Sequence, residues 1–327
     1  MTAYGLLIRR FALAVLVGFV SLWPTVRADQ PPAMSRIGVL NPFGIATLEQ
    51  SLQDELRQRG YMEGKNIVID WRRSTGTEEE LRQLAIELAR SKADLIVALG
   101  SPATRAALQG TILPVVFLVG DPVATGFAAS LAKPGGSGTG VSVLTPELNP
   151  KRLEFLHLIA PRARRIGLLT NSSNPLSSRS KEDVRTAART LGIQIEVLDA
   201  RNQRELETAL NTIRHSPPDG LLVSAEAFFM ASKAKISQTV HKARIPAIFP
   251  YREYHANGAL ISYGPDLNQV GHLMGVYVDK ILKGAKPADL PIEQISKYQL
   301  IIDLRVAREI GITVPLELLL RADEVIR

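Results

Sequence analysis

Short apolar runs alternate with amphipathic segments along this chain, and the whole alternation occurs twice. The first copy opens with RIGVL at 36–40 and the second with RIGLLT at 165–170. In both copies the next apolar run begins about 30 residues later, the length of one strand–helix unit of a parallel sheet. Apolar runs bounded by segments of 3.6-residue periodicity are typical of parallel strands covered by helices on both faces. The sequence therefore predicts an α/β fold with two doubly wound parallel-sheet lobes.

Two lobes in one chain need connections, and the sequence predicts three crossings. The Gly-rich stretch at 133–143 separates the copies. Because it neither follows the first strand nor opens a helix, it is interpreted as a loop leading into the first crossing and not as a dinucleotide-binding fingerprint. We expect the helix at 266–287 to return to lobe one and the strand at 298–304 to close lobe two, which places a hinge beside a central cleft. The predicted boundaries are 29–143 with 265–290 for lobe one, and 144–264 with 291–327 for lobe two.

Residues 1–28 have the layout of a cleaved signal peptide. Arg9 and Arg10 precede an apolar run at 11–23, and the stretch 26–28 fits a small-residue cleavage site. The alternative is a membrane anchor, but this run is short for a span of about 20 residues. We therefore expect export to the periplasm with cleavage before Asp29, and a mature chain that does not span a membrane.

Charge and cysteine content exclude several functional classes. The formal net charge is +7, and three of the arginines lie in residues 1–28, which leaves +4 for the mature chain. Without a block of like charges or a basic helix interleaved with aromatics, nothing favours nucleic-acid binding. The absence of cysteine excludes disulfides, thiolate metal sites and cysteine nucleophiles. The chain has no HExxH, GxSxG or P-loop motif, so we predict no enzyme activity, catalytic residue, metal or cofactor.

Candidate binding residues are those that directly follow the predicted strands, because ligands of open α/β sheets bind outside the carboxyl ends of the strands. Asp121 follows the apolar run 114–120 and could take a cationic nitrogen of the ligand or cap the following helix. Ser101 could contact an anionic ligand group at a helix start or serve as the N-cap. For Asn41 and Asn174 the alternative is ordinary turn chemistry, and for the tyrosines it is packing. The further candidates are Asn41, Asn171, Asn174, Glu226, Tyr251 and Tyr263.

Seven segments follow one another along the chain: GYMEGKNIVIDWR, LIVALGSPAT, VVFLVGDPVATG, PGGSGTGVS, ISYGPDL, ILKGAKPADLPIEQ and RVAREIGITVPLELLLRADEVI. Taken in this order, they resemble the tryptophan/tyrosine-type family of ABC-transporter substrate-binding proteins, which have a type-I periplasmic-binding-protein fold. The resemblance covers nearly all of the chain after residue 28.

The resemblance implies a monomeric binding protein that traps a small amino-acid-like or aromatic molecule by Venus-flytrap closure. Its expected partners are that ligand and a cognate ABC permease and ATPase. A ligand sensor of the same fold that feeds a membrane signalling protein is the alternative, and a periplasmic enzyme is a third class. The family's cleft residues carry over to Ser101 and Asp121. The chain departs from the family at Ser137, where the family usually has Asn, and at Glu226, near which it often has Asp, so the ligand itself stays open.

Overall fold

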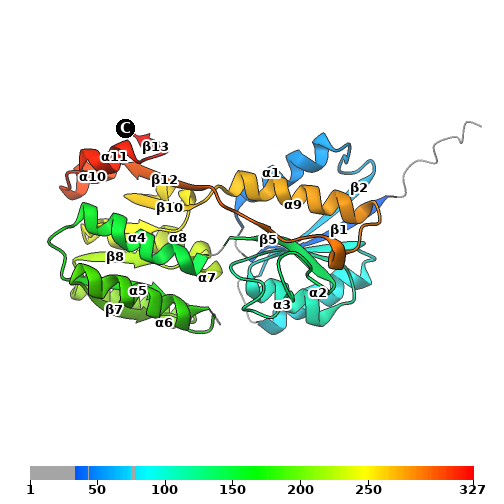
Figure 1. Cartoon of the computed structure of the whole chain (residues 1–327), viewed down its shortest axis with the longest axis horizontal. Helices are drawn as coiled ribbons and strands as arrows, with labels where there is room; N and C mark the ends of the chain where they lie inside the picture. The colour runs from blue at the N-terminus through cyan, green and yellow to red at the C-terminus, as the bar shows by residue number, and fades with distance from the viewer. Residues whose placement is uncertain (1–33, 43, 75–77, 144, 175) are drawn as a thin grey trace, which may run out of the picture. The chain divides into compact units, whose positions relative to one another are not determined.

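A computed structural model describes residues 34–327 apart from 43, 75–77, 144 and 175. The predicted signal peptide and its cleavage site before Asp29 lie outside the described residues. Two β-sheets, each covered by helices on both faces, make up the described chain (Figure 1). The prediction of an α/β fold with two doubly wound, mostly parallel sheets is confirmed.

The first sheet has six strands in the order β11-β5-β4-β3-β1-β2, all paired in parallel. Helices α1 and α9 pack together over one face, and α2 and α3 over the other (Figure 1). Alternate residues of β3 belong to different apolar clusters, as expected of a strand buried on both faces. The elements are β1 (Ser35–Leu40), α1 (Ala46–Gln58), β2 (Ile67–Arg72), α2 (Glu78–Arg90), β3 (Leu95–Leu99), α3 (Ser101–Gly110), β4 (Val115–Val119), β5 (Gly138–Ser142), α9 (Leu267–Leu282), η2 (Pro287–Asp289) and β11 (Glu293–Gln294).

The Gly-rich stretch contains a strand, so its interpretation as a loop was wrong for residues 138–142. These residues form β5, which lies beside β4. Gly140 has φ +144°, and a Cβ atom added there would lie 2.2 Å from the carbonyl oxygen of Phe117. Glycine is therefore what allows the two backbones to approach, although glycine in a sequence favours loops.

The second sheet has seven strands in the order β13-β12-β10-β9-β8-β6-β7. All neighbours are parallel except β12, which runs antiparallel to β10. Helices α4 and α5 cover one face, while α6 and α8 cover the other. The elements are α4 (Thr145–Ile159), β6 (Arg165–Thr170), α5 (Ser177–Leu191), β7 (Gln194–Asp199), α6 (Gln203–His215), β8 (Gly220–Val223), α7 (Ala227–Ala231), α8 (Lys233–Lys242), β9 (Ala247–Phe249), η1 (Arg252–Asn257), β10 (Ile261–Pro265), β12 (Tyr298–Asp303), α10 (Leu304–Ile310), α11 (Leu316–Leu320) and β13 (Glu324–Ile326).

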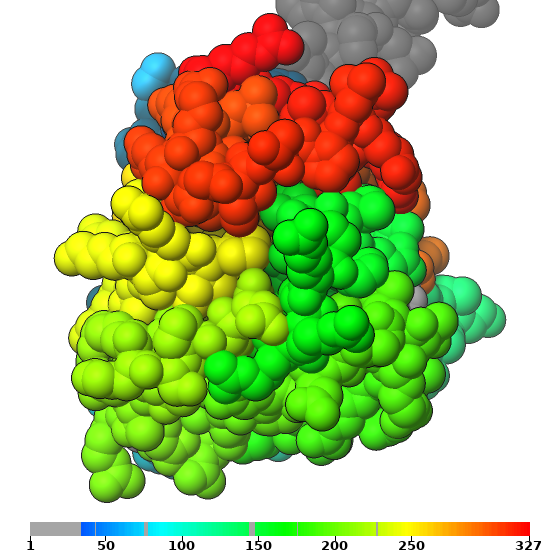
Figure 2. Space-filling view, turned by 90° about the vertical axis from the view of Figure 1, so that its left-hand side faces the viewer, coloured from blue at the N-terminus to red at the C-terminus, as the bar shows by residue number. Residues whose placement is uncertain are grey.

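The C-terminal segment closes one end of the second sheet. Leu318 of α11 and Phe155 of α4 belong to one apolar cluster, and the guanidinium of Arg321 lies 5.1 Å from the centre of the Phe155 ring. Figure 2 shows this segment, in orange to red, lying against the green surface that includes α4. The last residues of the chain are therefore part of the packed structure.

The chain passes between the sheets three times: between β5 and α4, between β10 and α9, and between β11 and β12. The lobe boundaries and the hinge at these passages stay predictions. Among the described residues, no helix combines the length and the apolar character needed to cross a membrane.

Candidate functional site

The strand order reverses at the first strand of each sheet. Strand β1 lies between β2 and β3, and β6 lies between β7 and β8. Successive connections therefore leave in opposite directions, and a crevice remains at the carboxyl ends of the two adjacent strands, which is where open α/β sheets bind ligands. The predicted site residues follow these strands: Asn41 and Ser101 in the first sheet, and Asn171, Asn174 and Glu226 in the second.

Asn41 is fully buried and holds the turn between β1 and α1. Its Nδ2 donates to Oε1 of Glu49 at 2.5 Å, and its Oδ1 accepts from the backbone N–H of Gly44 at 3.1 Å. Glu49 in turn pairs with Arg73 at 2.6 Å. These contacts fit the turn-chemistry interpretation of Asn41.

Ser101 is the first helical residue of α3, and the N-cap position belongs to Gly100, which makes no side-chain cap. The N-cap interpretation of Ser101 was therefore wrong by one position. A positive φ of 90° at Gly100 turns the chain sharply enough to start the helix there. The Ser101 hydroxyl is partly exposed and has no hydrogen-bond partner within the described part of the chain. It lies in the first turn of the helix, where unpaired backbone N–H groups favour an anion.

Asp121 follows β4 and organises the turn after it. Its Oδ1 accepts from the backbone N–H groups of Val123, at 3.1 Å, and Ala124, at 2.9 Å. The capping contacts are thus present, although they serve a turn and not the start of a helix, because no helix begins there. Its Oδ2 lies 3.9 Å from Nη1 of Arg179 on α5. The carboxylate is therefore already engaged by protein groups.

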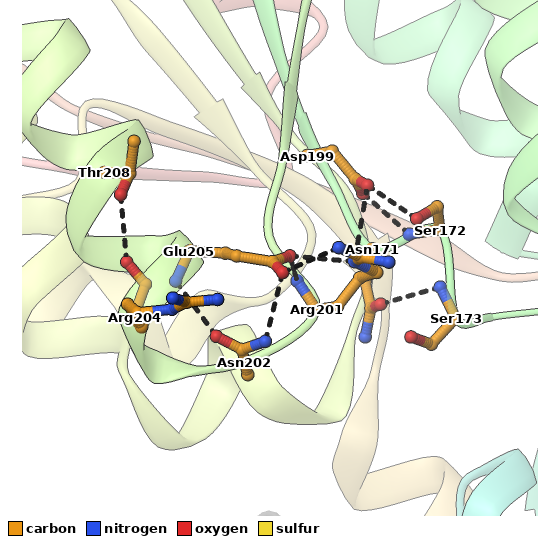
Figure 3. Close-up of polar contacts among 9 residues, drawn as sticks. All are labelled: Asn171, Ser172, Ser173, Asp199, Arg201, Asn202, Arg204, Glu205 and Thr208. Carbon is orange, nitrogen blue, oxygen red and sulfur yellow. Dashed lines mark hydrogen bonds and ion pairs between the residues drawn. The ribbon is translucent and has the colours of Figure 1, made fainter.

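Asn171 belongs to a polar cluster beyond the ends of β6 and β7 (Figure 3). Its Oδ1 accepts from the backbone N–H of Ser173 at 2.9 Å, which closes the turn. Asp199 accepts from the backbone N–H of Ser172 at 2.8 Å and from its hydroxyl at 2.5 Å. Arg201 lies 4.0 Å from Asp199. The contacts of Asn171 fit a structural role, and Asp199, which ends an apolar run, had not been predicted as part of this cluster.

Asn174 and Glu226 lie together. Nδ2 of Asn174 is 3.0 Å from each carboxyl oxygen of Glu226, and its Oδ1 accepts from the backbone N–H of Leu176 at 3.0 Å. Glu226 occupies the N-cap position of α7 without a side-chain cap, so its carboxyl group is directed elsewhere. Loss of hydration raises the pKa of Glu226 to about 8, and the hydrogen bond from Asn174 offsets only part of this shift.

A small pocket opens beside this pair, between the ends of β6 and β8 and the start of α5. Its cavity volume is about 20 Å³, which is enough for a water molecule or a small polar head group but not for a whole amino acid. Ser224 is only 4 % exposed, and its hydroxyl has no hydrogen-bond partner among the described residues. The lining residues are Asn149, Thr170, Asn174, Leu176, Ser177, Ser180, Ser224, Ala225 and Glu226.

Among these wall residues, Asn174 and Glu226 were predicted from the sequence, and the others were not. Ser224 directly follows β8, so its position at a strand end was a usable signal. Asn149 lies in the first half of α4, which was not recognised as helical from the sequence, and donates through Nδ2 to the Ser180 hydroxyl at 2.6 Å.

The predicted tyrosines lie around a buried arginine that the sequence analysis also missed. Arg152 is fully buried, and its Nε donates to the carbonyl oxygen of Tyr263 at 2.8 Å. Burial lowers the pKa of Arg152 to about 10, whereas it raises that of Tyr251 to about 12. The Tyr263 ring packs edge-on against Phe155 at 5.0 Å between centroids. This packing fits the structural interpretation of Tyr263.

The other titratable groups suit structure more than catalysis. His255 is buried, its Nε2 lies 2.9 Å from the Ser262 hydroxyl, and burial lowers the pKa of the imidazole to about 4. Within residues 34–327, leaving aside the undescribed positions, no three His, Asp or Glu side chains gather as a metal site. The side chains at the strand ends can therefore offer a ligand hydrogen bonds and the buried carboxyl group of Glu226.

Comparisons with known proteins agree with this geometry. The family model for ABC transporter substrate binding proteins matches residues 40–326. A curated relative, a tyrosine-binding protein of Clostridioides difficile (strain R20291), is 27% identical over 251 residues, which are 76% of this chain and 72% of the relative.

Two solved structures extend the comparison. An ABC domain from Streptococcus pneumoniae in complex with L-Trp has 26% identity and a TM-score of 0.82, and the match covers 90% of this chain and 100% of that one. A periplasmic solute binding protein from Actinobacillus succinogenes with bound D-allose shares the fold, with a TM-score of 0.59, 11% identity, and coverage of 84% of this chain and 99% of that one. The fold is thus that of type-I periplasmic binding proteins, and this is a binding protein rather than an enzyme. The chain belongs to the family of ABC transporter substrate-binding proteins.

Proposed function

We propose that this protein is the extracytoplasmic receptor of an ABC importer and that it binds a small amino-acid-like or aromatic molecule between its two lobes. The observation that carries the proposal is the position of hydrogen-bonding side chains at both switch points, with Ser101 after β3 and the Asn174–Glu226 pair after β6 and β8. Support also comes from the family and from two similar proteins, one named for tyrosine and one solved with L-Trp.

Each lobe would contribute a different chemistry. The free hydroxyl of Ser101 and the first turn of α3 suit an acceptor group of the ligand, such as a carboxylate. Glu226 and Asn174 offer carboxyl and amide groups to the opposite end. Tyr251 is half-buried beside β9 and could provide an aromatic surface, while Asp121 could contribute a further acceptor from the first lobe.

The proposed cycle follows from the two-lobe organisation. The mature protein would work in the periplasm as a monomer, after removal of the predicted signal peptide. Ligand contacts from both lobes would favour a closed arrangement, reached by rotation at the three passages between the sheets, and the closed complex would deliver the ligand to a permease and its ATPase.

The test is to identify the ligand and then to follow its transport. Protein purified without denaturation from the periplasm should release a small molecule that mass spectrometry identifies, and L-tyrosine and L-tryptophan should raise the melting temperature of the ligand-free protein. Deletion of the gene should then abolish high-affinity uptake of that molecule. Normal uptake in the deletion strain, with retained binding by the protein, would favour a sensor over a transport receptor.

A further inference from the structure

Among the described residues, no cation contacts the carboxyl group of Glu226. Its only side-chain hydrogen-bond partner in the described structure is the uncharged amide of Asn174. The pocket beside it is polar but uncharged. Its other polar lining groups are the amide of Asn149 and the hydroxyls of Thr170, Ser177, Ser180 and Ser224. Within the described chain, one amide is all that stabilises a negative charge on this carboxyl group.

The ionisable groups around Glu226 do not supply the missing positive charge. From the segment after β9, Tyr251 and Tyr254 interact electrostatically with Glu226, and burial raises the pKa of both phenols, so they stay neutral. Arg152 of α4 and Glu253 of η1 act on the same tyrosines and do not contribute to the pKa of Glu226. On α5, Arg179 lies 3.9 Å from both Asp121 and Asp183. The residues of this helix that line the pocket are Ser177 and Ser180.

Ser224 provides an independent sign that the pocket is incomplete. Its hydroxyl is buried and lines the same pocket as Glu226, yet it has no partner within the described chain. A buried hydroxyl without a partner is unfavourable, and such groups are usually satisfied by a water or a ligand. The space available, about 20 Å³, fits a group the size of a water molecule, such as an ammonium group.

We propose that this pocket receives the protonated amine of the ligand, which binds between Glu226 and Ser224 and displaces the carboxyl proton of Glu226 to solvent. The inference rests on the proposed binding function and names the ligand class as a primary amine. In the step, the O–H bond of the carboxyl group breaks, its proton goes to the buffer, and the amine keeps its own proton. The product is an ammonium–carboxylate pair, with an ammonium N–H also donating to the Ser224 hydroxyl.

The protonation state of Glu226 agrees with this step. Loss of hydration raises the pKa of the free carboxyl group to about 8, so it is mostly uncharged at pH 7. An ammonium group within hydrogen-bond distance would lower that pKa again. Capture of the ligand is therefore coupled to the release of close to one proton at neutral pH, and the coupling disappears once the free carboxyl group is already ionised.

Calorimetric titration in buffers of different ionisation enthalpy measures this release directly. The probes are L-tryptophan and L-tyrosine, with indole-3-propionic acid and 3-(4-hydroxyphenyl)propionic acid as counterparts that lack the amine. We expect an amino acid that binds to release close to one proton at pH 7 and clearly less at pH 8.5, where the free carboxyl group is mostly ionised and the amine is still protonated, and its deaminated counterpart to bind weakly and release none. In E226Q the release should vanish, and the affinity should fall about 10- to 100-fold. The matched control is E182Q, which changes an exposed glutamate of α5 and should behave like the wild type.

A second measurement tests the proton on Glu226 without any ligand. In protein with ¹³C-labelled glutamate carboxyl groups, the Glu226 resonance is identified by its absence from E226Q and followed as the pH is raised. Titration near pH 8 supports the proposal, and titration in the ordinary range of glutamate, near pH 4, overturns it. Binding of an amino acid without proton release also overturns it. If none of the probes binds while Glu226 titrates near pH 8, the proposed aromatic ligand class is wrong, but the inference that the carboxyl group of Glu226 is uncharged at pH 7 is supported.

Discussion

Arg152 donates through Nη1 to Oδ1 of Asn149 at 2.6 Å, one turn earlier on α4. Asn149 connects Arg152 to the wall of the pocket, because its Nδ2 donates to the Ser180 hydroxyl at 2.6 Å. The same guanidinium holds the carbonyl oxygen of Tyr263 through Nε, and its Nη2 has no partner among the described residues. A buried cation that pairs with no carboxylate in the described part of the chain therefore fixes one wall of the candidate site and the end of β10.

Replacing Arg152 by lysine is expected to weaken both connections. A lysine ammonium cannot donate in two fixed directions as the planar guanidinium does, so Asn149 or Tyr263 loses its partner. We expect R152K to lower the free energy of unfolding by about 1–3 kcal/mol, the cost of a buried polar group left unpaired. K151R, one residue away at an exposed position of the same helix, is the control. Urea unfolding curves measure the effect, and equal stability of R152K and the wild type would contradict this role.

Gly140 carries a second prediction, about the fold itself. Because a Cβ atom there would lie 2.2 Å from the Phe117 carbonyl oxygen, G140A must push β5 away from β4. A backbone clash at a positive φ should cost at least about 2 kcal/mol of stability. Gly136, which has no atom within 4 Å of the equivalent position, is the matched control, and G136A should unfold within about 0.5 kcal/mol of the wild type. Thermal melting of the two variants side by side decides the point.

The sequence was most informative where apolar runs end. The runs before Ser101, Asn174 and Glu226 correspond to buried strands, so a residue placed after a run could be placed at the carboxyl end of a sheet. Sequence alone could not separate Asn171 from Asn174, because both follow β6. Only the folded turn shows that one amide closes its own backbone turn while the other reaches the carboxyl group of a residue 52 positions away.

Proline and glycine residues made part of α4 and the strand β5 hard to recognise from the sequence. Pro146 and Pro150 hid the first half of α4, since proline is tolerated in the first turn of a helix, where Pro146 lies, but is unexpected inside one, where Pro150 lies. Without the first half of that helix, neither Asn149 nor Arg152 could be associated with the site. The glycines of β5 hid a strand in the same way, because glycine favours loops unless a close backbone contact requires it.

Asp121 should act on stability more than on affinity. Its Oδ1 accepts two backbone N–H groups, so D121A is expected to lower the free energy of unfolding by about 1 kcal/mol, as for the loss of a cap. D121N keeps an acceptor oxygen and should be nearly as stable as the wild type. Because its carboxylate is already engaged, D121N should weaken the binding of an amine ligand less than E226Q does. Calorimetric titration compares the two variants, and a larger loss in D121N would make Asp121 the main acceptor of the cationic group.

Ser101 should show the opposite behaviour. Its hydroxyl has no partner in the described structure, so S101A removes no protein contact, and the unfolding free energy should change by less than about 0.5 kcal/mol. If the hydroxyl binds the ligand, the affinity should fall by about 0.5–1.5 kcal/mol, the usual contribution of one hydrogen bond. T104A, which removes a hydroxyl bonded to the Gly100 carbonyl oxygen, is the contrast, since it should affect stability instead. An unchanged affinity in S101A would remove this residue from the site.

The raised pKa of Glu226 predicts how stability depends on pH in the absence of ligand. The carboxyl group titrates at the ordinary value of 4.5 in the unfolded chain and at about 8 in the folded protein. Between these pH values the folded state holds a proton that the unfolded state has released, so the free energy of unfolding falls as the pH rises through this window. Below pH 4.5 both states are protonated, and above pH 8 both are ionised, so this group then adds no further slope.

The variant E226Q isolates the contribution of this single group. Glutamine keeps the shape and cannot ionise, so the stability of the wild type relative to E226Q should decrease steadily from pH 5 to pH 8 and level off above it. Taking the difference between the two proteins cancels the other titrating groups, including the half-buried Glu253, whose pKa burial also raises. Urea unfolding at pH 5, 6.5, 8 and 9 gives this difference, and E182Q in place of E226Q should give a flat line. A pH-independent difference for E226Q would show that Glu226 is ionised in the folded protein, with its charge balanced by groups other than the amide of Asn174.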